Sequence, residues 1–380
     1  MSLTDNIKAE AEALGFFLYG VTHPGQPPHL QQYKNWLEAG RHGQMAYLSR
    51  PDSVAKRADP SLILKECQSI LSLGVLYSSP LYQPDTHQAG EIRGRVAAYA
   101  WGEDYHAVLP PRLERLAEKI AAILGRPIQH RRYTDTGPIL ERDLAQAAGL
   151  GWIGKNTCLI SPHAGSFFFL AELLLNVEIE PDPPFLFDRC GTCRRCIEAC
   201  PTGCILPDRT IDAGRCISYL TIENKSEIPI ELRPQVGKWV FGCDICQEVC
   251  PWNLRFARPA GDPAFAPRPG ISRPVLQDEL KLTPRSFNQK FKASPILRAR
   301  RRGYLRNVCV ALGNQPDPDS VPILAEFLSS EPEALARSHA AWALGKIKTA
   351  AARQALDKSL KTETVTGALQ EIRLALAGLP

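Results

Sequence analysis

The chain has 380 residues, of which 44% are hydrophobic and 22% are charged, and its formal net charge is +5. These values are typical of a globular protein with two or three domains. No apolar run approaches the roughly 20 residues of a membrane helix, and residues 1–5 have no basic region or twin arginine. We therefore expect a cytoplasmic protein with no membrane association, in which twelve cysteines serve metal binding in a reducing compartment.

Residues 1–185 read as a mixed α/β domain. The hydrophobic spacing predicts helices, whereas uninterrupted apolar runs predict buried strands. A polar loop follows the second strand, up to about Gly90. Residues 7–17 have helical spacing, and the predicted helix ends at Gly15, before a predicted strand at 16–21. A helix at 33–39 and strands at 69–77 and 96–101 follow. The last elements are a helix at 109–124, opened by two prolines and ended by Gly125, and a strand at 166–177.

Four polar clusters lie between these elements, at 56–60, 102–106, 131–138 and 149–157. The last is rich in glycine, which lets backbone approach a flat or phosphorylated ligand. It matches neither GxGxxG nor GxxxxGK[ST], so nucleotide binding is poorly supported. Each cluster taken alone is typical of a polar loop, and Asp135 taken alone is more typical of a helix cap than of a catalytic acid.

Two cysteine runs follow, Cys190-x2-Cys193-x2-Cys196-x3-Cys200-Pro and Cys243-x2-Cys246-x3-Cys250-Pro. A thiolate at every third residue reaches several corners of one iron–sulfur cube, and the cysteine before proline ligates the neighbouring cube. The runs predict two [4Fe–4S] clusters in a bacterial ferredoxin-like domain at 186–258. A zinc site is the main alternative, and a disulfide framework is a weaker one because no export signal precedes it.

The crossing rule divides the ligands into two sets. Cys190, Cys193, Cys196 and Cys250 form the first set, and Cys200, Cys243 and Cys246 belong to the second. Cys216 and Cys204 are the candidates for the missing fourth thiolate, and we favour Cys216 because it follows a turn signal. The three remaining cysteines lie in apolar settings and are predicted to be small buried side chains, namely Cys67, Cys158 and Cys309.

The composition changes beyond a proline-rich linker at 259–284. The Ala-Leu-Gly motif of residues 311–313 recurs at 343–345, and 374–378 repeats it at the same step. A period near 30 residues predicts HEAT-like helical repeats over 285–380, with three ordinary alanine-rich helices as the alternative. No acidic residue lies between Pro284 and Asp317, where many arginines gather, and this density indicates a nucleic-acid partner.

Several motifs in this order resemble one family. They are the 135–143 segment beginning Asp-Thr-Gly-Pro, the Gly-x-Gly-Trp-Ile-Gly-Lys-Asn-Thr segment at 149–157, the first cysteine run, the Cys216-Ile-Ser-Tyr segment and the second run with its trailing Pro-Trp-Asn. Together they resemble the epoxyqueuosine reductases, which are cobalamin-dependent tRNA-modifying enzymes. The resemblance implies an α+β multidomain fold, with an N-terminal α/β cobalamin-binding domain, a ferredoxin-like domain and an all-α HEAT-like C-terminal domain.

The resemblance also implies a reaction. Cob(I)alamin would attack the epoxide of epoxyqueuosine at the wobble position of a tRNA, an aspartic acid would protonate the opening oxygen, and loss of water would leave queuosine. Electrons would come from an external low-potential donor through the two clusters. The resemblance assigns the proton donor to Asp135, whose pKa we expect burial beside the corrin and the bound base to raise, and the support of acid and substrate to Asp104, Tyr105 and His106.

Further roles follow from the same resemblance. His106 is not assigned as a cobalt ligand because position 109 is Leu where a DxHxxG motif needs Gly, so base-off cobalamin is expected. The expected cobalamin contacts, besides Asp135, are Arg57, Lys155, Asn156, Ser161, Ser218 and Gln247. The expected tRNA contacts are Lys225, Lys238, Arg298, Arg300, Arg301, Arg302 and Arg306. The alternatives are a reductive dehalogenase and a non-enzymatic iron–sulfur RNA-binding module, and a monomer is expected.

Overall fold

The computed structural model describes residues 2–82 and 91–379. The predicted loop up to about Gly90 falls largely outside these residues. Contacts divide the chain into two units. The first unit comprises 1–83, 102–213 and 244–266, and the second comprises 84–101, 214–243 and 267–380.

The first unit is built on a four-stranded antiparallel sheet with the order β1-β2-β7-β4. Its strands are β1 (Leu18–Thr22), β2 (Ser69–Leu76), β7 (Phe168–Leu175) and β4 (His130–Tyr133). A separate hairpin pairs β5 (Trp152–Ile153) with β6 (Leu159–Ile160). The two predicted apolar strands at 69–77 and 166–177 are therefore confirmed as β2 and β7, which form the centre of the sheet.

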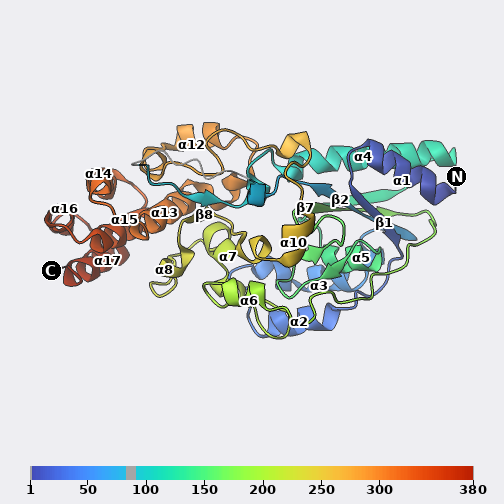
Figure 1. The fold of residues 1–380 in the computed structure, drawn as a ribbon, viewed down its shortest axis with the longest axis horizontal. Coiled ribbons are helices and arrows are strands. Elements are labelled where there is room, and N and C mark those ends of the chain that lie inside the picture. Colours follow the sequence, from blue (N-terminus) through green and yellow to red (C-terminus); the bar gives the residue numbers. More distant parts are fainter. Residues whose placement is uncertain (1, 83–90, 380) are drawn as a thin grey trace. The chain divides into compact units, whose positions relative to one another are not determined.

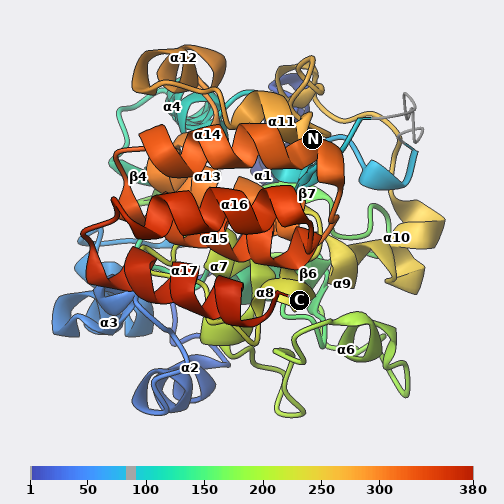
Figure 2. The ribbon, with the colours of Figure 1, turned by 90° about the vertical axis from the view of Figure 1, so that its left-hand side faces the viewer.

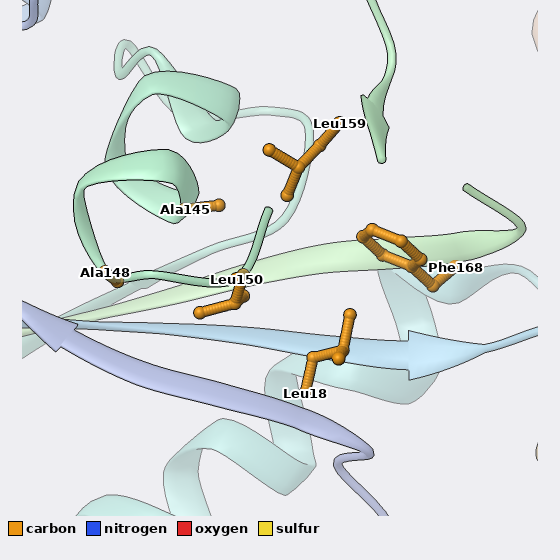
Figure 3. Close-up of a cluster of buried hydrophobic side chains, with 6 residues drawn as sticks. All are labelled: Leu18, Ala145, Ala148, Leu150, Leu159 and Phe168. Carbon is orange, nitrogen blue, oxygen red and sulfur yellow. The ribbon is translucent and has the colours of Figure 1, made fainter. Parts of the chain in front are cut away.

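Helices cover both faces of this sheet. On one face, α1 (Leu3–Ala13) packs against α4 (Tyr105–Leu124), and on the other α5 (Glu141–Ala147) contacts β1, β2 and β7 (Figure 1). Figure 3 shows the apolar cluster between α5 and the sheet, in which Leu18 and Phe168 face Leu150 and Leu159. The unit's other helices are α2 (Leu30–Glu38), α3 (Pro51–Ala58), α6 (Arg195–Ala199), α9 (Ile245–Glu248) and α10 (Pro251–Phe256).

The second unit contains a small sheet and a stack of helices. Its parallel strands are β3 (Arg95–Val96) and β8 (Trp239–Phe241). Four short helices accompany them, namely α7 (Ile217–Ile222), α8 (Arg233–Val236), α11 (Leu276–Glu279) and α12 (Pro284–Lys290). The C-terminal helices are α13 (Arg300–Gly313), α14 (Val321–Ser330), α15 (Ala334–Ile347), α16 (Ala350–Leu360) and α17 (Thr366–Ala377).

The repeated Ala-Leu-Gly motif is where the C-terminal helices meet. The helices α13, α15 and α17 pack in that order, with α14 and α16 in a second layer (Figure 2). A Cβ on Gly313 would overlap the Trp342 ring of α15, and one on Gly345 would come within 2.9 Å of Ala375 of α17. The glycines therefore permit close helix contact at each step of the repeat, as the HEAT-like prediction requires.

Two predicted elements differ from the structure. The expected strand at 96–101 continues only to Val96, and residues 98–100 form a 3-10 turn. The helix expected from Leu109 begins four residues earlier at Tyr105, because the Asp104 carboxylate accepts a hydrogen bond from the His106 amide and caps its N-terminus. The two prolines thus lie inside the second turn rather than at the helix start. Over the described residues, no helix is both long and apolar enough to cross a membrane.

Candidate active site

Asp135 lies in a short loop between β4 and α5 whose backbone is tightly constrained. The loop is anchored by buried Thr134, whose hydroxyl donates a 2.8 Å hydrogen bond to the Leu170 carbonyl of β7. Asp135 itself has a φ of 60°, a left-handed conformation that costs free energy for residues other than glycine. Residue Leu140 occupies the position before α5, so the interpretation of Asp135 as a helix cap is wrong.

Two side chains from the start of α4 converge on Asp135, and the helix cap Asp104 holds one of them. The Tyr105 hydroxyl donates a 3.0 Å hydrogen bond to Asp135 Oδ2. The same oxygen lies 3.4 Å from His106 Nε2, and His106 Nδ1 lies 2.8 Å from Asp104 Oδ1. The structure therefore brings together all four residues that the sequence assigned to proton transfer and its support.

The electrostatics place a proton on His106. Burial alone would lower its pKa, but hydrogen bonds and charge from Asp104 and Asp135 outweigh this and raise the pKa of His106 to about 9. Burial tends to raise the pKa of Asp135, yet the hydrogen bonds from His106 and Tyr105 and the His106 charge leave that pKa below its usual value. In the free chain His106 is therefore the protonated partner, and the raised pKa expected for Asp135 once cofactor and substrate are bound stays a prediction.

A second carboxyl group lies directly behind Asp135. Glu141 Oε1 accepts a 2.5 Å hydrogen bond from the Asp135 amide, and the Glu141 carboxyl lies within hydrogen-bonding reach of that of Glu172 in β7. The sequence analysis did not assign a role to either residue. The sequence nevertheless marks Glu172 as unusual, because it is the one charged residue in the apolar stretch from Phe167 to Val177.

The first predicted cluster set lines a single cavity of about 210 Å³. Its lining includes all four of the expected thiols, Cys190, Cys193, Cys196 and Cys250. The indole N–H of Trp152 donates to Cys190 Sγ at 3.5 Å, an interaction typical of iron–sulfur thiolates. Cysteines from both runs thus meet at one cavity, as the crossed assignment requires, and sulfur is the donor that iron–sulfur clusters use.

The second predicted set is distributed over both units. Cys200 and Cys246 belong to the first unit, whereas Cys216 and Cys243 belong to the second, at the start of α7 and after β8. Within the first unit, Cys204 is buried and its Sγ lies 3.5 Å from Cys200 Sγ. The hydrogen bond from Cys204, with others from Thr202, lowers the pKa of Cys200 to about 5, so Cys204 favours the thiolate form of Cys200.

The cysteines outside the two predicted cluster sets differ in how deeply they are buried. Within the described ranges, no group of three or more His, Cys, Asp or Glu side chains could hold one metal ion. Cys309 is fully buried, as predicted. Cys67 and Cys158 are only partly buried, so for them the prediction of burial is correct only in part.

Comparisons with known proteins identify the family of this chain. The family described as Epoxyqueuosine reductase QueG, DUF1730 matches residues 57–136, a 4Fe-4S double cluster binding domain matches 189–253, and HEAT repeats match 294–377. An epoxyqueuosine reductase of Pseudomonas aeruginosa is 40% identical over 348 residues, which covers 90% of this chain and 94% of the relative. This chain belongs to the epoxyqueuosine reductase family. This chain has a mixed α and β fold like that of a solved epoxyqueuosine reductase, and it carries matches to an iron–sulfur domain and to HEAT repeats.

Other epoxyqueuosine reductases match over similar lengths. That of Cyclobacterium marinum is 39% identical over 309 residues, 80% of this chain and 95% of the relative. One solved epoxyqueuosine reductase structure contains a tRNA-Tyr epoxyqueuosine-modified stem loop, with a TM-score of 0.91, 31% identity and coverage of 99% and 98%. A Bacillus subtilis structure with an aspartate catalytic loop swung out of its active site has a TM-score of 0.90, 31% identity and coverage of 100% and 99%.

The cofactor contacts expected of a family member lie in polar, partly buried surroundings. Buried Arg57 donates to the Ser53 carbonyl, and its guanidinium lies 5.5 Å from the centre of the Tyr33 ring. Gln247 accepts a 2.8 Å hydrogen bond from Ser166. The third expected contact of this group, Ser161, is buried, with a hydroxyl that accepts a hydrogen bond from the His163 amide.

Two further expected contacts lie beside the cysteines instead. Lys155 Nζ donates to the carbonyls of Gly191 and Cys193 at 2.6 and 2.9 Å, which holds the loop of the first run. Asn156 donates to the Cys246 carbonyl at 3.4 Å and lines the same cavity as Lys155. The last expected contact, Ser218, lies in α7 of the second unit.

The basic residues of the second unit divide into buried and exposed groups. Arg306 is fully buried, and its guanidinium donates to the carbonyls of Leu220, Asn224 and Ser226. Arg301 pairs through both terminal nitrogens with the buried carboxylate of Glu331. The prediction that Arg306 contacts a tRNA phosphate is therefore wrong, because its guanidinium is buried. The same prediction for Arg301 stays a prediction, since its side chain is partly exposed.

The other five predicted phosphate contacts are at least partly accessible. Arg298 is exposed but makes a two-point ion pair with Glu223. Lys225 donates to the carbonyls of Ile222 and Arg298, and burial lowers its pKa. Lys238 and Arg300 are exposed and Arg302 is half-buried.

Proposed function

We propose that this chain reduces epoxyqueuosine to queuosine at the wobble position of a tRNA. The observation that carries the proposal is the convergence of Tyr105 and His106 on Asp135 in a chain that also carries a double-cluster domain. Full-length relatives named epoxyqueuosine reductase, and a related structure holding an epoxyqueuosine-modified tRNA stem loop, support the same substrate. The net reaction consumes two electrons and two protons and releases the epoxide oxygen as water.

Asp135 is proposed to deliver the proton to the opening epoxide oxygen. Its carboxylate is 65% exposed, so a bound substrate can reach it. In the free chain the proton lies on His106, 3.4 Å away. His106 would protonate Asp135 as substrate displaces water and the carboxylate loses solvation, because desolvation favours the neutral acid. Asp104 would hold the His106 ring throughout through Nδ1.

Base-off cobalamin is the proposed partner centre, and when bound it would supply the reduced cobalt nucleophile that clusters alone lack. The residues of the first unit fit such a group in two respects. The polar residues Arg57, Ser161 and Gln247 lie in this unit, and of these Gln247 is partly exposed. Both His106 nitrogens are engaged by carboxylates, which supports a cofactor without histidine on the metal.

The clusters are proposed to receive electrons singly from an external low-potential donor. The first would be held by the four cysteines that line one cavity, and the second by Cys200, Cys216, Cys243 and Cys246. The domain division at 185, 258 and 284 likewise remains a prediction, as do the monomeric state and the cytoplasmic location.

The proposed tRNA contacts are now restricted to the accessible basic residues. Lys238, Arg300 and Arg302 are the best placed, followed by Lys225 and Arg298. Phosphate contacts release counterions, so each lost contact should weaken binding and flatten its dependence on salt. Replacing Lys238 and Arg300 by Ala should therefore weaken binding of a tRNA stem loop and reduce the slope of log affinity against log salt.

The decisive experiment is mass analysis of epoxyqueuosine-containing tRNA incubated with the protein, cobalamin and a strong reductant. We expect the wild type to remove one oxygen atom and Asp135→Asn to fail. Asp278→Asn is the matched control, because Asp278 is an exposed carboxylate of α11 paired only with Lys281 at the surface. An unreactive wild type would refute the function, and a fully active Asp135→Asn would remove Asp135 from the mechanism.

A further inference from the structure

Glu172 is a carboxyl group buried in the middle of a sheet. It lies in central strand β7, is 0% exposed and faces Ser72 of β2 and Tyr133 of β4 in the strand register. Ser72 Oγ lies 3.5 Å from Glu172 Oε1, and Oε2 accepts no hydrogen bond from the described chain. A lone carboxylate in such a place would be very costly, so the group requires either a proton or a cation.

Its nearest charged neighbour is another carboxyl group. Glu141 is the first residue of α5, and its carboxyl lies within hydrogen-bonding reach of that of Glu172. Two ionised carboxylates offer only acceptors, so a hydrogen bond between them requires one shared proton. Because Glu141 Oε1 already accepts the Asp135 amide at 2.5 Å, the proton belongs on Glu172, whose Oε2 receives no other donor.

The electrostatics agree with this placement. Burial raises the pKa of both groups, and their mutual repulsion adds to it, which brings Glu141 to about 7 and Glu172 well above its usual value. The other charged or titratable groups that face the pair are Asp135 in the loop, Arg142 in α5 and Tyr133 in β4. Arg142 is exposed to solvent, so it neutralises the pair only weakly.

We propose that Glu172 and Glu141 form a carboxylic acid–carboxylate pair that positions Asp135. Glu172 donates its proton to Glu141, and the Glu141 carboxylate in turn accepts the Asp135 amide. This role rests on the proposed function, since it is Asp135 as proton donor that needs holding. Glu141 and Glu172 are positioning residues, because neither contacts the Tyr105 hydroxyl or the His106 ring that bind the Asp135 carboxylate.

The backbone conformation of Asp135 explains why this residue needs a positioning hydrogen bond. Asp135 has a φ of 60°, so its conformation is disfavoured unless its surroundings hold it. A hydrogen bond from a backbone amide to an ionised carboxylate is stronger than one to a neutral oxygen. Loss of that bond would let Asp135 leave the left-handed conformation and carry its carboxylate away from Tyr105 and His106.

The shared proton can be measured without any turnover. A carboxylic acid has an infrared C=O stretch that ionised carboxylates lack. Difference spectra of wild type against Glu172→Gln at about pH 8, where Glu141 is ionised, should show one such band, which shifts in heavy water. If that band is missing from the wild type, or persists unchanged in Glu172→Gln, the acid–carboxylate pair does not exist.

Two substitutions at Glu172 separate positioning from folding. Glu172→Gln keeps an N–H donor for Glu141, so we expect kcat within about 3-fold of the wild type. Glu172→Leu removes the donor, and we expect kcat to fall about 10- to 100-fold with KM for tRNA nearly unchanged. Equal activity of the two variants, high or low, would overturn the proposal.

Amide hydrogen exchange gives a readout independent of both catalysis and overall stability. In Glu172→Leu, the peptide carrying Asp135 should exchange faster, while peptides from α1, on the opposite face of the sheet, should not. A uniform rise across the protein would indicate simple destabilisation and would count against the proposal. If the wild type lacked turnover altogether, the infrared and exchange results would still decide whether the pair holds Asp135.

Discussion

The Tyr105 hydroxyl donates a 3.0 Å hydrogen bond to Asp135 Oδ2. The tyrosine ring is itself fixed, because it is buried and stacks on Phe169 with ring centres 4.4 Å apart. A rigid aromatic ring from α4 thus fixes one position of a carboxylate carried by a strained loop. This arrangement links the fold to the chemistry, since Phe169 belongs to central strand β7.

The first prediction concerns that hydrogen bond. Tyr105→Phe keeps the stacked ring but removes the hydroxyl, so we expect the protein to fold normally. A hydrogen bond to a charged group contributes about 1.5–3 kcal/mol, and turnover should therefore fall roughly 10- to 100-fold. Single-turnover kinetics on epoxyqueuosine tRNA would measure this, and wild-type rates in Tyr105→Phe would show that the hydroxyl has no part in placing the acid.

The second prediction is an alkaline limit to activity set by His106. Its pKa is raised to about 9, so the imidazolium is present at neutral pH and is lost as the pH rises through that value. Turnover should accordingly be constant from about pH 7 to 8 and decline near pH 9. His106→Gln should be slower at every pH and should lack this decline. A wild-type profile that stays flat to pH 10 would contradict the assignment.

The sequence predicted those features that local patterns determine. The apolar runs of β2 and β7, the spacing of the cysteines and the Ala-Leu-Gly repeat each reflect packing or ligation within a short segment. The start of α4 differs from the prediction, because Pro110 and Pro111 indicate a helix that opens near Leu109. The capping carboxylate of Asp104 decides the start instead, and the sequence analysis gives that residue a role in the site but none in capping.

Features that depend on distant segments could not be read from the chain. Arg306 belongs to a dense basic run, but α13 is surrounded by other elements, and the guanidinium satisfies three backbone carbonyls near α7. Charge density does not say which arginines point inward. Likewise Glu172 and Glu141 are 31 positions apart in the sequence, and only the neighbouring positions of β7 and α5 bring their carboxyls into contact.

The third prediction tests the crossed ligand assignment. Because Cys250 lines the same cavity as Cys190, Cys193 and Cys196, Cys250→Ser and Cys190→Ser should each lose the same cluster. Iron should fall from about eight atoms to about four in both variants, and their reduced electron paramagnetic resonance spectra should match. Cys67→Ser is the control, since Cys67 lies in a different apolar cluster, and it should keep all the iron. Different residual spectra for the two variants would rule out the crossed assignment.

The fourth prediction uses two glycines of one helix. In α13, a Cβ on Gly313 would overlap Trp342, whereas a Cβ on Gly303 would meet only Ala299 at 3.9 Å. Gly313→Ala should therefore destabilise the protein by about 1–3 kcal/mol through overpacking. Gly303→Ala should stabilise it by up to about 1 kcal/mol, because alanine is the better helix former. Urea unfolding would measure both, and equal effects would contradict the close contact of α13 with α15.

The fifth prediction follows from a buried neutral histidine in α15. His339 is fully buried, its Nδ1 bonds the Leu335 carbonyl at 2.8 Å and its Nε2 accepts the Ile228 amide at 3.2 Å. Because a carbonyl only accepts, the proton must lie on Nδ1. Burial, with the charges of Arg233 and Arg306, holds the pKa of His339 well below 6.5.

The free energy of unfolding depends on pH because the folded and unfolded chains differ in whether His339 binds a proton. Below pH 6.5 the unfolded chain protonates this histidine and the folded chain does not, so the free energy of unfolding decreases as the pH falls. The loss should approach about 1.4 kcal/mol per pH unit for this single proton. Other groups titrate equally in His339→Gln, so the difference between wild type and variant over pH 5–6.5 isolates the effect. Parallel stability curves for the two proteins would mean that His339 is protonated in the fold, and the Ile228 amide would then need another acceptor.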